Sequence, residues 1–229
     1  MNKETKRPYT ICHMITSLDG RIDCGMLENL AEYETYCKAI EALNAPTTVT
    51  GSGTIVRDEI AVAGTFPTDN PISKEAFSKK VDAIGYEVYA DSTGKYLWEK
   101  ETSATKPHLI LTSTRVSKEY LAYLDEQNIS WIATGDAHVD LVRAMEILSE
   151  VFGVERVAVV GGSALNTGFL KAGLLDEISI LIGHGIDGRK GMPTVFDGLE
   201  MDYPTTVLEL SDVQKFDDGA VWLRYNVGQ

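Results

Sequence analysis

Hydrophobic residues in the second half of the chain follow two alternating patterns. Short runs rich in valine, leucine and isoleucine are separated by stretches in which apolar positions recur at helical spacing. Strands that alternate with helices in this way are typical of right-handed crossovers and a largely parallel sheet. The predicted elements are, in chain order, strand Leu109–Thr112, helix Lys118–Glu126, strand Ile129–Thr134, helix Val139–Phe152, strand Arg156–Val160 and helix Ser163–Ala172.

The first half of the chain follows the same scheme less regularly. Tyr9–Thr16 predicts a first strand, Glu28–Leu43 predicts a helix with its apolar residues near one face, and Thr47–Thr50 predicts a short strand. Residues 60–106 are the least regular region because threonine, aspartate, glycine and lysine are frequent there. A strand pair is predicted within that region, at Tyr86–Ala90 and Lys95–Trp98.

The C-terminal part changes the pattern. Three predicted strands follow one another with no convincing helix between them, at Glu177–Ile182, Thr205–Leu210 and Ala220–Asn226. Strands joined without crossover helices favour an antiparallel hairpin at the edge of the sheet. Because no repeat, linker or low-complexity tract interrupts the chain, residues 1–229 are expected to form a single α/β domain.

Charge and composition narrow the range of partners. The formal net charge is −13, from 21 basic and 34 acidic residues, which argues against a nucleic-acid backbone or an anionic membrane as the main partner. A small phosphorylated ligand stays compatible, since N–H groups and one or two arginines can set the potential of a cleft. The chain has no apolar run long enough to span a bilayer and no apolar signal-peptide core at its N-terminus.

Cysteine and histidine usage indicates a reduced, metal-free protein. Cys12, Cys24 and Cys37 are odd in number and show no Cys-x-x-Cys spacing, so reduced thiols in the cytoplasm are expected. The four histidines are scattered without metal-ligand spacing, and no metal site is expected.

The most informative segment is the turn after the Val157–Val160 run. Gly161 and Gly162 allow a tight turn and the close approach of a ligand, and Ser163 is a good N-cap for the helix that follows. The free N–H groups and positive end of a helix N-terminus suit a phosphate. Taken alone, an ordinary strand-to-helix turn explains this segment equally well.

Three other predicted strands end in comparable segments. Ser17–Gly20 and Gly51–Thr54 carry small or turn-forming residues, and Thr112–Arg115 offers hydroxyls with a guanidinium. Ligands of open α/β sheets bind beyond the carboxyl ends of the strands, so these ends are expected to line one cleft. An Arg/Ser/Thr segment suits a phosphate monoester, although by itself a helix cap with a solvent-facing Arg115 is the simpler interpretation.

Taken together, a helix-terminus site and an arginine site favour a dinucleotide with an extra phosphate, which points to NADPH. The chain lacks G-x-G-x-x-G after its first strand and lacks a P-loop, so neither a standard Rossmann site nor an NTPase is supported.

An ordered set of motifs over nearly the whole chain resembles the reductase domain of bacterial riboflavin biosynthesis, within the dihydrofolate-reductase-like superfamily. The motifs are Arg7-Pro-Tyr, Ser17-Leu-Asp-Gly-Arg-Ile22, Gly51-Ser-Gly-Thr54 with Asp58, Val160-Gly-Gly-Ser-Ala-Leu165, Leu174-Leu-Asp-Glu-Ile178 and Gly188-Arg-Lys-Gly-Met-Pro-Thr-Val-Phe196.

This resemblance implies a three-layer fold with a mostly parallel central sheet, NADPH as hydride donor and a homodimer. It places the two glycine turns against the cofactor and the Ser/Thr/Arg segment toward the adenosine phosphate. The cofactor-binding residues expected from the turns and the resemblance are Ser17, Gly51, Gly53, Thr54, Ser113, Arg115, Gly161, Gly162, Ser163 and Leu165.

The family reduces a phosphoribosyl-aminopyrimidine and opens its ribose to a ribityl chain. The resemblance makes Asp58 a substrate-side catalytic acid, which could bond a hydroxyl or relay a proton, and Arg21 a ligand for a substrate phosphate. Asp58 is equally well explained as a helix-terminal acid. For Asp19 a turn residue bonding its own backbone is the stronger interpretation, and Asp176-Glu177 is expected to orient the strand that follows.

The chain departs from the family pattern on the substrate side. Val160 stands where the family commonly has glutamate before the glycine pair, and Cys24–Glu28 replaces a Ser-x-Trp-Ile-Thr segment. The Asp-Pro-x-Leu-Thr-x-Arg continuation is also missing after Asp58, and no deaminase motif occurs. The cofactor is therefore better supported than the substrate.

Two functions stay open at this point. The first is an NADPH-dependent reductase acting on the riboflavin intermediate or on another small carbonyl, imine or pteridine-like compound, which would stack near Tyr33 or Trp98. The second is a nucleotide-binding module without catalysis, acting as a sensor or assembly partner. A phosphate-binding hydrolase lacks a visible nucleophile–base pair.

Overall fold

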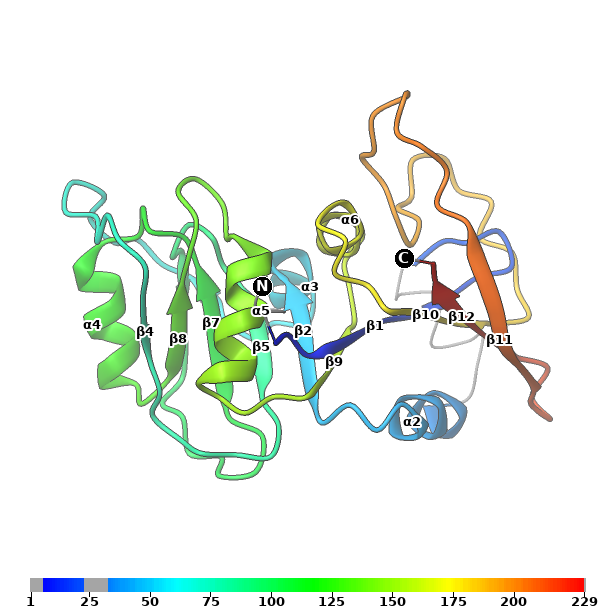
Figure 1. Cartoon of the computed structure of the whole chain (residues 1–229), viewed down its shortest axis with the longest axis horizontal. Coiled ribbons are helices and arrows are strands. Elements are labelled where there is room, and N and C mark those ends of the chain that lie inside the picture. Colours follow the sequence, from blue (N-terminus) through cyan, green and yellow to red (C-terminus); the bar gives the residue numbers. More distant parts are fainter. Residues whose placement is uncertain (1–5, 23–32, 229) are drawn as a thin grey trace, which may run out of the picture. The chain divides into compact units, whose positions relative to one another are not determined.

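The computed structural model of the chain describes residues 6–22 and 33–228, which fall into two compact units (Figure 1). Among the described residues, unit 1 consists of 6–8 and 46–157, and unit 2 consists of 9–22, 33–45 and 158–228. Each unit is built around its own group of hydrogen-bonded strands. The fold is α/β, with mostly parallel strands and an antiparallel C-terminal hairpin, as the sequence predicts.

Unit 1 contains a parallel sheet with one antiparallel edge strand. Its strands lie in the order β2-β5-β7-β8-β4, and only β4 runs against its neighbour. These strands are β2 (Thr47–Gly51), β5 (Glu87–Ala90), β7 (His108–Thr112), β8 (Ser130–Ala133) and β4 (Ala76–Ser78). A separate small ladder joins β3 (Val62–Ala63) to β6 (Tyr96–Leu97).

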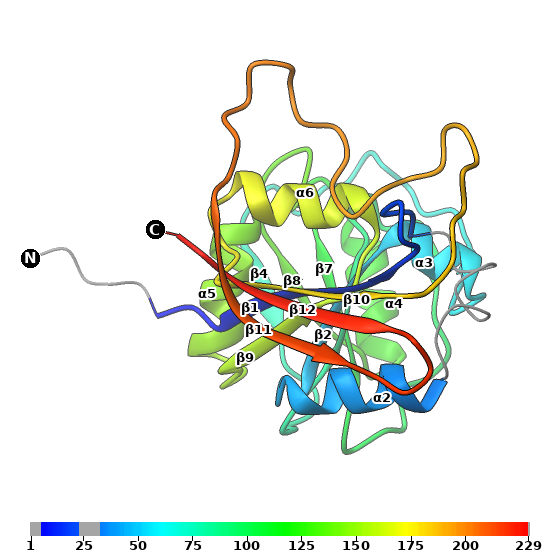
Figure 2. The same ribbon diagram turned by 90° about the vertical axis from the view of Figure 1, so that its right-hand side faces the viewer.

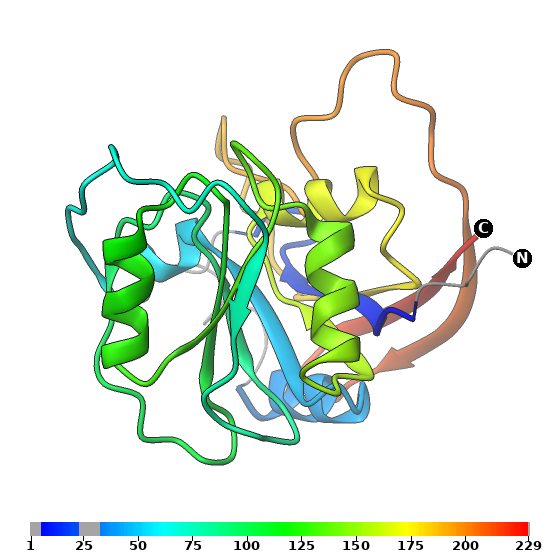
Figure 3. The same cartoon turned by 60° about the vertical axis from the view of Figure 1, so that its left-hand side comes forward.

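The helices of unit 1 are α3 (Ser52–Arg57), α4 (Lys118–Glu126) and α5 (Leu141–Glu150). The side chain of Ser117 caps α4 and that of Asp140 caps α5, each accepting a bond from an N–H of the first turn. Helix α4 covers one face of the strands and α5 covers the other (Figure 3). Right-handed crossovers require this arrangement, because the chain moves outward from β7 to β8 and returns in the opposite direction after β8.

Burial in the core of unit 1 explains why its strands are continuous apolar runs in the sequence. Leu109, Ile110 and Leu111 are fully buried, since both faces of β7 are covered. On the α4 face, Tyr120 and Leu124 pack in one cluster with residues of β7 and β8. Parallel pairing also brings the carboxyl ends of β2, β5, β7 and β8 to one edge of this sheet.

Unit 2 has the strand order β11-β12-β10-β1 (Figure 2). Strands β1 and β10 are parallel, and β12 runs antiparallel to both β10 and β11. Helices α2 and α6 lie on opposite faces of these strands. The elements are β1 (Tyr9–Thr16), β10 (Glu177–Ile182), β11 (Leu208–Lys215), β12 (Val221–Val227), α2 (Tyr33–Ala42) and α6 (Ser163–Lys171). Strand β9 (Arg156–Val159) crosses the boundary between the units.

Three predictions about elements are wrong. The segment 86–90 does not pair with 95–98, because β5 pairs in parallel with β2 and β7 while β6 pairs with β3. The strand predicted at Thr205–Leu210 is shifted to Leu208–Lys215, and a register irregularity between Leu210 and Asp212 breaks the alternation that marks a strand. Residues predicted as an open turn after β2 form the helix α3.

Some predictions concern residues that the structure does not describe, or are not tested by it. The first residues of the predicted helix Glu28–Leu43 and the Cys24–Glu28 segment lie outside the described residues. That residues 1–229 form a single domain stays a prediction.

A buried histidine gives unit 2 a pH-dependent stability. His13 lies in β1, with Nδ1 2.9 Å from the hydroxyl of Ser179, which also accepts a 2.7 Å bond from the indole of Trp222. Burial lowers the pKa of His13 to about 4; the charge of Arg224 acts in the same direction, and the bond to Ser179 opposes it. The folded protein therefore holds His13 neutral where the unfolded chain binds a proton.

We expect the free energy of unfolding to fall as the pH drops from about 6.5 toward 4, because protonation favours the unfolded chain in that window. The loss at pH 4.5 attributable to His13 is roughly 2 kcal/mol. Urea unfolding at pH 7 and pH 4.5 should show a smaller difference for His13→Gln than for the wild type. The exposed His138→Gln is the control and should keep the wild-type difference; equal losses in all three proteins would contradict the assignment.

Candidate functional site

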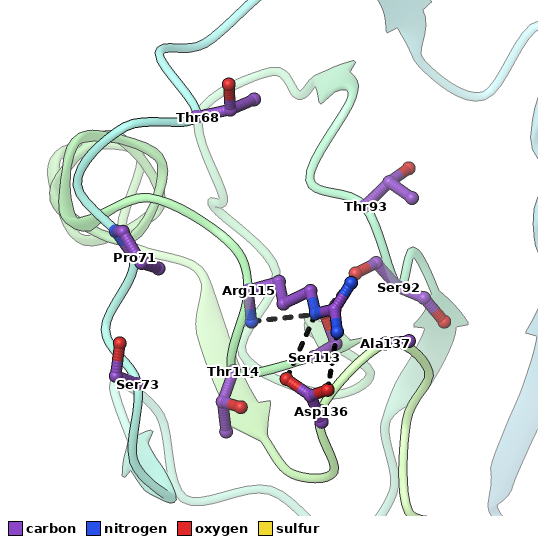
Figure 4. Close-up of a pocket in the computed structure, with 10 residues that line it drawn as sticks. All are labelled: Thr68, Pro71, Ser73, Ser92, Thr93, Ser113, Thr114, Arg115, Asp136 and Ala137. Atoms are coloured by element: carbon purple, nitrogen blue, oxygen red, sulfur yellow. Dashed lines mark hydrogen bonds and ion pairs between the residues drawn. The ribbon is translucent and has the colours of Figure 1, made fainter.

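The carboxyl ends of β5, β7 and β8 surround a cleft of about 630 Å³ in unit 1 (Figure 4). Hydroxyl-bearing side chains predominate among its walls, with one arginine and one aspartate facing each other. The lining residues are Thr68, Pro71, Ser73, Ser92, Thr93, Ser113, Thr114, Arg115, Asp136 and Ala137. The structure thus brings the predicted Ser113 and Arg115 into one cavity.

Ser113 and Arg115 have different roles in this cleft. The hydroxyl of Ser113 is buried and donates a 2.7 Å bond to the carbonyl of Ser92, so it ties the β5 and β7 loops together. Arg115 is exposed, and its guanidinium donates to both carboxylate oxygens of Asp136, Nε to Oδ1 at 3.0 Å and Nη2 to Oδ2 at 2.6 Å. The two hydrogen bonds of this pair raise the pKa of Arg115 and lower the pKa of Asp136, and the opposite charge of each partner adds to the effect. Arg115 does not simply face solvent.

Asp91 fixes the loop that follows β5. Its carboxylate is buried, accepts bonds from the N–H of Lys95 at 2.9 Å and the phenol of Tyr120 at 3.0 Å, and lies beside the hydroxyl of Thr93. Burial and the nearby Asp91 charge hold the pKa of Tyr120 well above its usual range. Sequence analysis missed both Asp91 and Asp136. The sequence does carry a signal for each of them: Asp91 follows a buried strand directly, and Asp136 lies three residues after another buried strand.

The glycine turn after β2 differs from its predicted form. Gly51 ends β2 and precedes α3, so Gly53 and Thr54 lie within a short helix rather than in an open turn. Gly53 has open space where a side chain would stand, and Thr54 is buried. Cofactor binding by these three residues stays a prediction.

Asp58 follows α3 directly and pairs with its neighbour Arg57. The guanidinium of Arg57 donates from Nε to Oδ1 at 2.7 Å and from Nη2 to Oδ2 at 2.9 Å, and both side chains are nearly half exposed. The N–H of Asp58 also bonds to the carbonyl of Thr54, as expected at a helix C-terminus. The helix-terminal interpretation fits these contacts. A catalytic role for Asp58 stays a prediction.

In unit 2 the two adjacent glycines have distinct surroundings. Gly161 has a φ of +101°, and a side chain there would begin 3.0 Å from the methyl of Met14. Gly162 has an ordinary φ and open space beside it. The peptide bond between them is cis.

The start of α6 corrects one predicted detail. Gly162, not Ser163, is the N-cap, and Ser163 is the first residue of the helix. The N–H of Leu165 bonds to the carbonyl of Gly162 at 3.0 Å, so the helix itself uses that donor. Binding of a cofactor by Gly161, Gly162, Ser163 and Leu165 stays a prediction.

The turn after β1 is tied to the 184–198 loop. The hydroxyl of Ser17 donates to Asp19 at 2.7 Å, and the Asp19 carboxylate accepts the N–H groups of Asp187 and Gly188, each at 2.9 Å. The bond from Ser17, followed by those two N–H groups, holds the pKa of Asp19 well below its usual range. Asp19 is structural, as predicted, but it fixes a distant loop and not only its own turn.

Arg21 is engaged with the same loop. Its Nη1 donates to the carbonyl of Met192 at 2.6 Å, and its backbone forms an antiparallel bridge with Thr194. From α6, the buried Asn166 donates to the carbonyl of Val195 at 2.9 Å, while no partner for its Oδ1 occurs among the described residues. The motif at 188–196 is thus held from two sides. Phosphate binding by Arg21 stays a prediction, and sequence analysis missed Asn166.

The described part of the chain contains no group of three or more His, Cys, Asp or Glu side chains arranged to hold a metal ion. None of its helices combines the length and apolar character that crossing a membrane requires. Trp98, considered as a stacking surface, is buried in the unit 1 core, so that suggestion is wrong. The side chain of Tyr33 lies outside the described residues.

Comparison with known proteins gives a consistent result. Residues 8–222 match the RibD C-terminal domain family. The chain is 26% identical, over 89% of its length and 90% of the relative's, to the 2,5-diamino-6-ribosylamino-4(3H)-pyrimidinone 5′-phosphate reductase of Methanothermobacter thermautotrophicus. It is 27% identical to the reductase of the same name from Aquifex aeolicus, over 84% of each chain.

Solved structures share the fold. A pyrimidine reductase-like protein from Corynebacterium diphtheriae superposes with a TM-score of 0.72 at 15% identity, covering 97% of this chain and 92% of the other. The riboflavin biosynthesis reductase of Saccharomyces cerevisiae gives 0.63 at 17% identity, covering 100% and 93%.

Proposed function

Because the chain belongs to the RibD C-terminal domain family, we propose that it is an NADPH-dependent reductase of riboflavin biosynthesis. The observation that carries this proposal is its similarity, over nearly the full length of both chains, to proteins named as 2,5-diamino-6-ribosylamino-4(3H)-pyrimidinone 5′-phosphate reductases. That compound, or its deaminated uracil counterpart, is the proposed substrate.

The proposed reaction converts a ribosylamino group to a ribitylamino group. When bound, NADPH would supply the hydride for a new C–H bond at C1′ of the sugar. The bond between C1′ and the ring oxygen breaks, and that oxygen takes a proton and becomes a hydroxyl. The protein has to hold the hydride-donating carbon of the nicotinamide against C1′ of the sugar and deliver a proton to the ring oxygen.

The cleft of unit 1 has the chemistry that the adenosine end of NADPH requires. Its walls carry several hydroxyls, and Arg115 presents a guanidinium fork that fits a phosphate oxygen pair. The glycine turn of unit 2 offers open space at Gly162, which suits the approach of a pyrophosphate. We propose that Ser17, Gly51, Gly53, Thr54, Ser163 and Leu165 complete the cofactor contacts.

On the substrate side we propose roles for Arg21 and Asp58. Arg21 is partly buried, its Nη1 donates to the carbonyl of Met192, and its Nε lies 3.9 Å from the carboxylate of Asp19. We propose that its remaining N–H groups bind a substrate phosphate. Asp58 would hold a hydroxyl or pass the proton to the ring oxygen, for which its pairing with Arg57 has to loosen. The surplus of negative charge fits a small-molecule enzyme of the cytoplasm that binds neither nucleic acid nor membranes, and we propose a homodimer.

The direct test is oxidation of NADPH in the presence of the diaminopyrimidinone ribosyl phosphate, followed at the nicotinamide absorbance. We expect substrate-dependent oxidation, and we expect Asp58→Asn to lower kcat by about 10²-fold with little change in NADPH affinity. Tight NADPH binding without turnover of this compound, its uracil counterpart, dihydropteridines or quinones would instead favour a nucleotide-binding module that lacks catalysis.

Gly162→Val should weaken NADPH binding while the fold is kept. The position has an ordinary φ, and a Cβ added there would meet no atom within 4 Å apart from its chain neighbours. A branched side chain is therefore expected to fit the folded chain and to occupy the space proposed for the pyrophosphate. We expect a loss of affinity of at least about 10-fold in calorimetric titration. An unchanged dissociation constant, with circular dichroism confirming the fold, would remove this turn from the cofactor site.

Arg115→Ala should weaken NADPH much more than NADH. The two cofactors differ only in the 2′-phosphate, so NADH serves as the internal control for damage to the rest of the site. Loss of a bidentate arginine–phosphate contact predicts a drop in NADPH affinity of about 10- to 100-fold. Equal losses for both cofactors, measured by fluorescence titration, would contradict recognition of the 2′-phosphate by Arg115.

A further inference from the structure

Residues 115 and 136 are held side by side by the backbone. Thr114, just before Arg115, donates to the carbonyl of Gly135 twice, from its N–H at 2.9 Å and from its hydroxyl at 2.7 Å. Gly135 has a φ of +70°, and a side chain there would begin 2.2 Å from the carbonyl of His138. The loop after β8 therefore has little freedom, and it holds Asp136 next to Arg115 in the wall of the cleft (Figure 4).

The resulting ion pair is complete but exposed. Asp136 accepts from two nitrogens of Arg115, while 64% of the arginine side chain and 75% of the aspartate side chain stay accessible. Exposed pairs of this kind contribute little to stability and exchange readily for other partners. Of the 10 residues that line the cleft, Arg115 and Asp136 are the two charged ones (Figure 4).

A phosphate that used the same Nε and Nη2 fork of Arg115 would displace this carboxylate. A phosphate bound through the remaining Nη1 edge would lie beside Asp136 and be repelled by it. In both cases Asp136 opposes the binding of a phosphate at Arg115. An unphosphorylated ribose has no such conflict, because its hydroxyls can donate to a carboxylate. The same cavity thus holds the residue types that favour each of the two nicotinamide cofactors.

We propose that Asp136 is a specificity-determining residue that competes with the cofactor 2′-phosphate for Arg115 and so limits the preference for NADPH over NADH. This inference rests on the proposed function and deepens it. It concerns the residue opposite the arginine, which no motif of the sequence marks.

The test is the ratio of NADH to NADPH dissociation constants for the wild type, Asp136→Asn, Arg115→Ala and the double variant. Asp136→Asn should tighten NADPH by about fivefold without tightening NADH, because the arginine no longer has a competing anion. In the Arg115→Ala background the same substitution should give a clearly smaller gain, because only the direct repulsion between Asp136 and the 2′-phosphate is then removed. The adenosine end alone should follow the same order, measured with 2′,5′-adenosine bisphosphate against 5′-AMP.

Asp82→Asn is the matched control. Asp82 also forms an exposed ion pair, with Lys79, so this variant makes the same change in net charge and also loses a pair. It lies shortly before β5 begins, away from the carboxyl ends that form the cleft. It should leave the cofactor ratio at the wild-type value.

Two results would overturn the inference while leaving the proposed function intact. One is an unchanged ratio in Asp136→Asn, with both cofactors bound tightly. The other is a gain of the same size in the Arg115→Ala background, which would show that Asp136 does not act by competing for Arg115. If the wild type bound neither dinucleotide, the proposed function would fail first and the inference with it.

Discussion

Parallel pairing of β2, β5, β7 and β8 is the constraint on which the candidate site of unit 1 depends. Parallel strands place every carboxyl end at one edge, so the loops that leave the sheet become neighbours although they are far apart in the sequence. The polar residues of those loops then bond across the edge, as Ser113 does to Ser92 and Thr114 to Gly135. The buried strands provide the rigid frame, and the loops carry the chemistry.

Sequence reasoning succeeded where a local pattern carried the information. Helices α4 and α5 have capping side chains at their starts and apolar faces of the right period, and β7 and β8 are continuous buried runs, so their existence and order were predictable. It failed where pairing depends on distant residues. Nothing local shows that β6 pairs with β3, or that β11 continues past its irregularity at Leu210.

Among the residues of the candidate site, too, those marked by a local pattern were predicted and those that depend on distant contacts were not. Ser113 and Arg115 were found because they follow a recognisable strand, and both line the cleft of unit 1. Asp136 was missed because the feature that marks it is its ion pair with Arg115, 21 positions earlier in the chain. Asn166 and Asp19 likewise act on the 184–198 loop through contacts that no spacing rule describes.

The two glycines before α6 separate the requirements of folding from those of ligand access. Gly161 is needed by the chain itself, because its φ of +101° is a backbone conformation that other residues rarely adopt, and a side chain there would also begin 3.0 Å from the methyl of Met14. Gly162 faces no such restriction. A stable fold therefore requires glycine at the first position, whereas at the second position only the proposed ligand would require it.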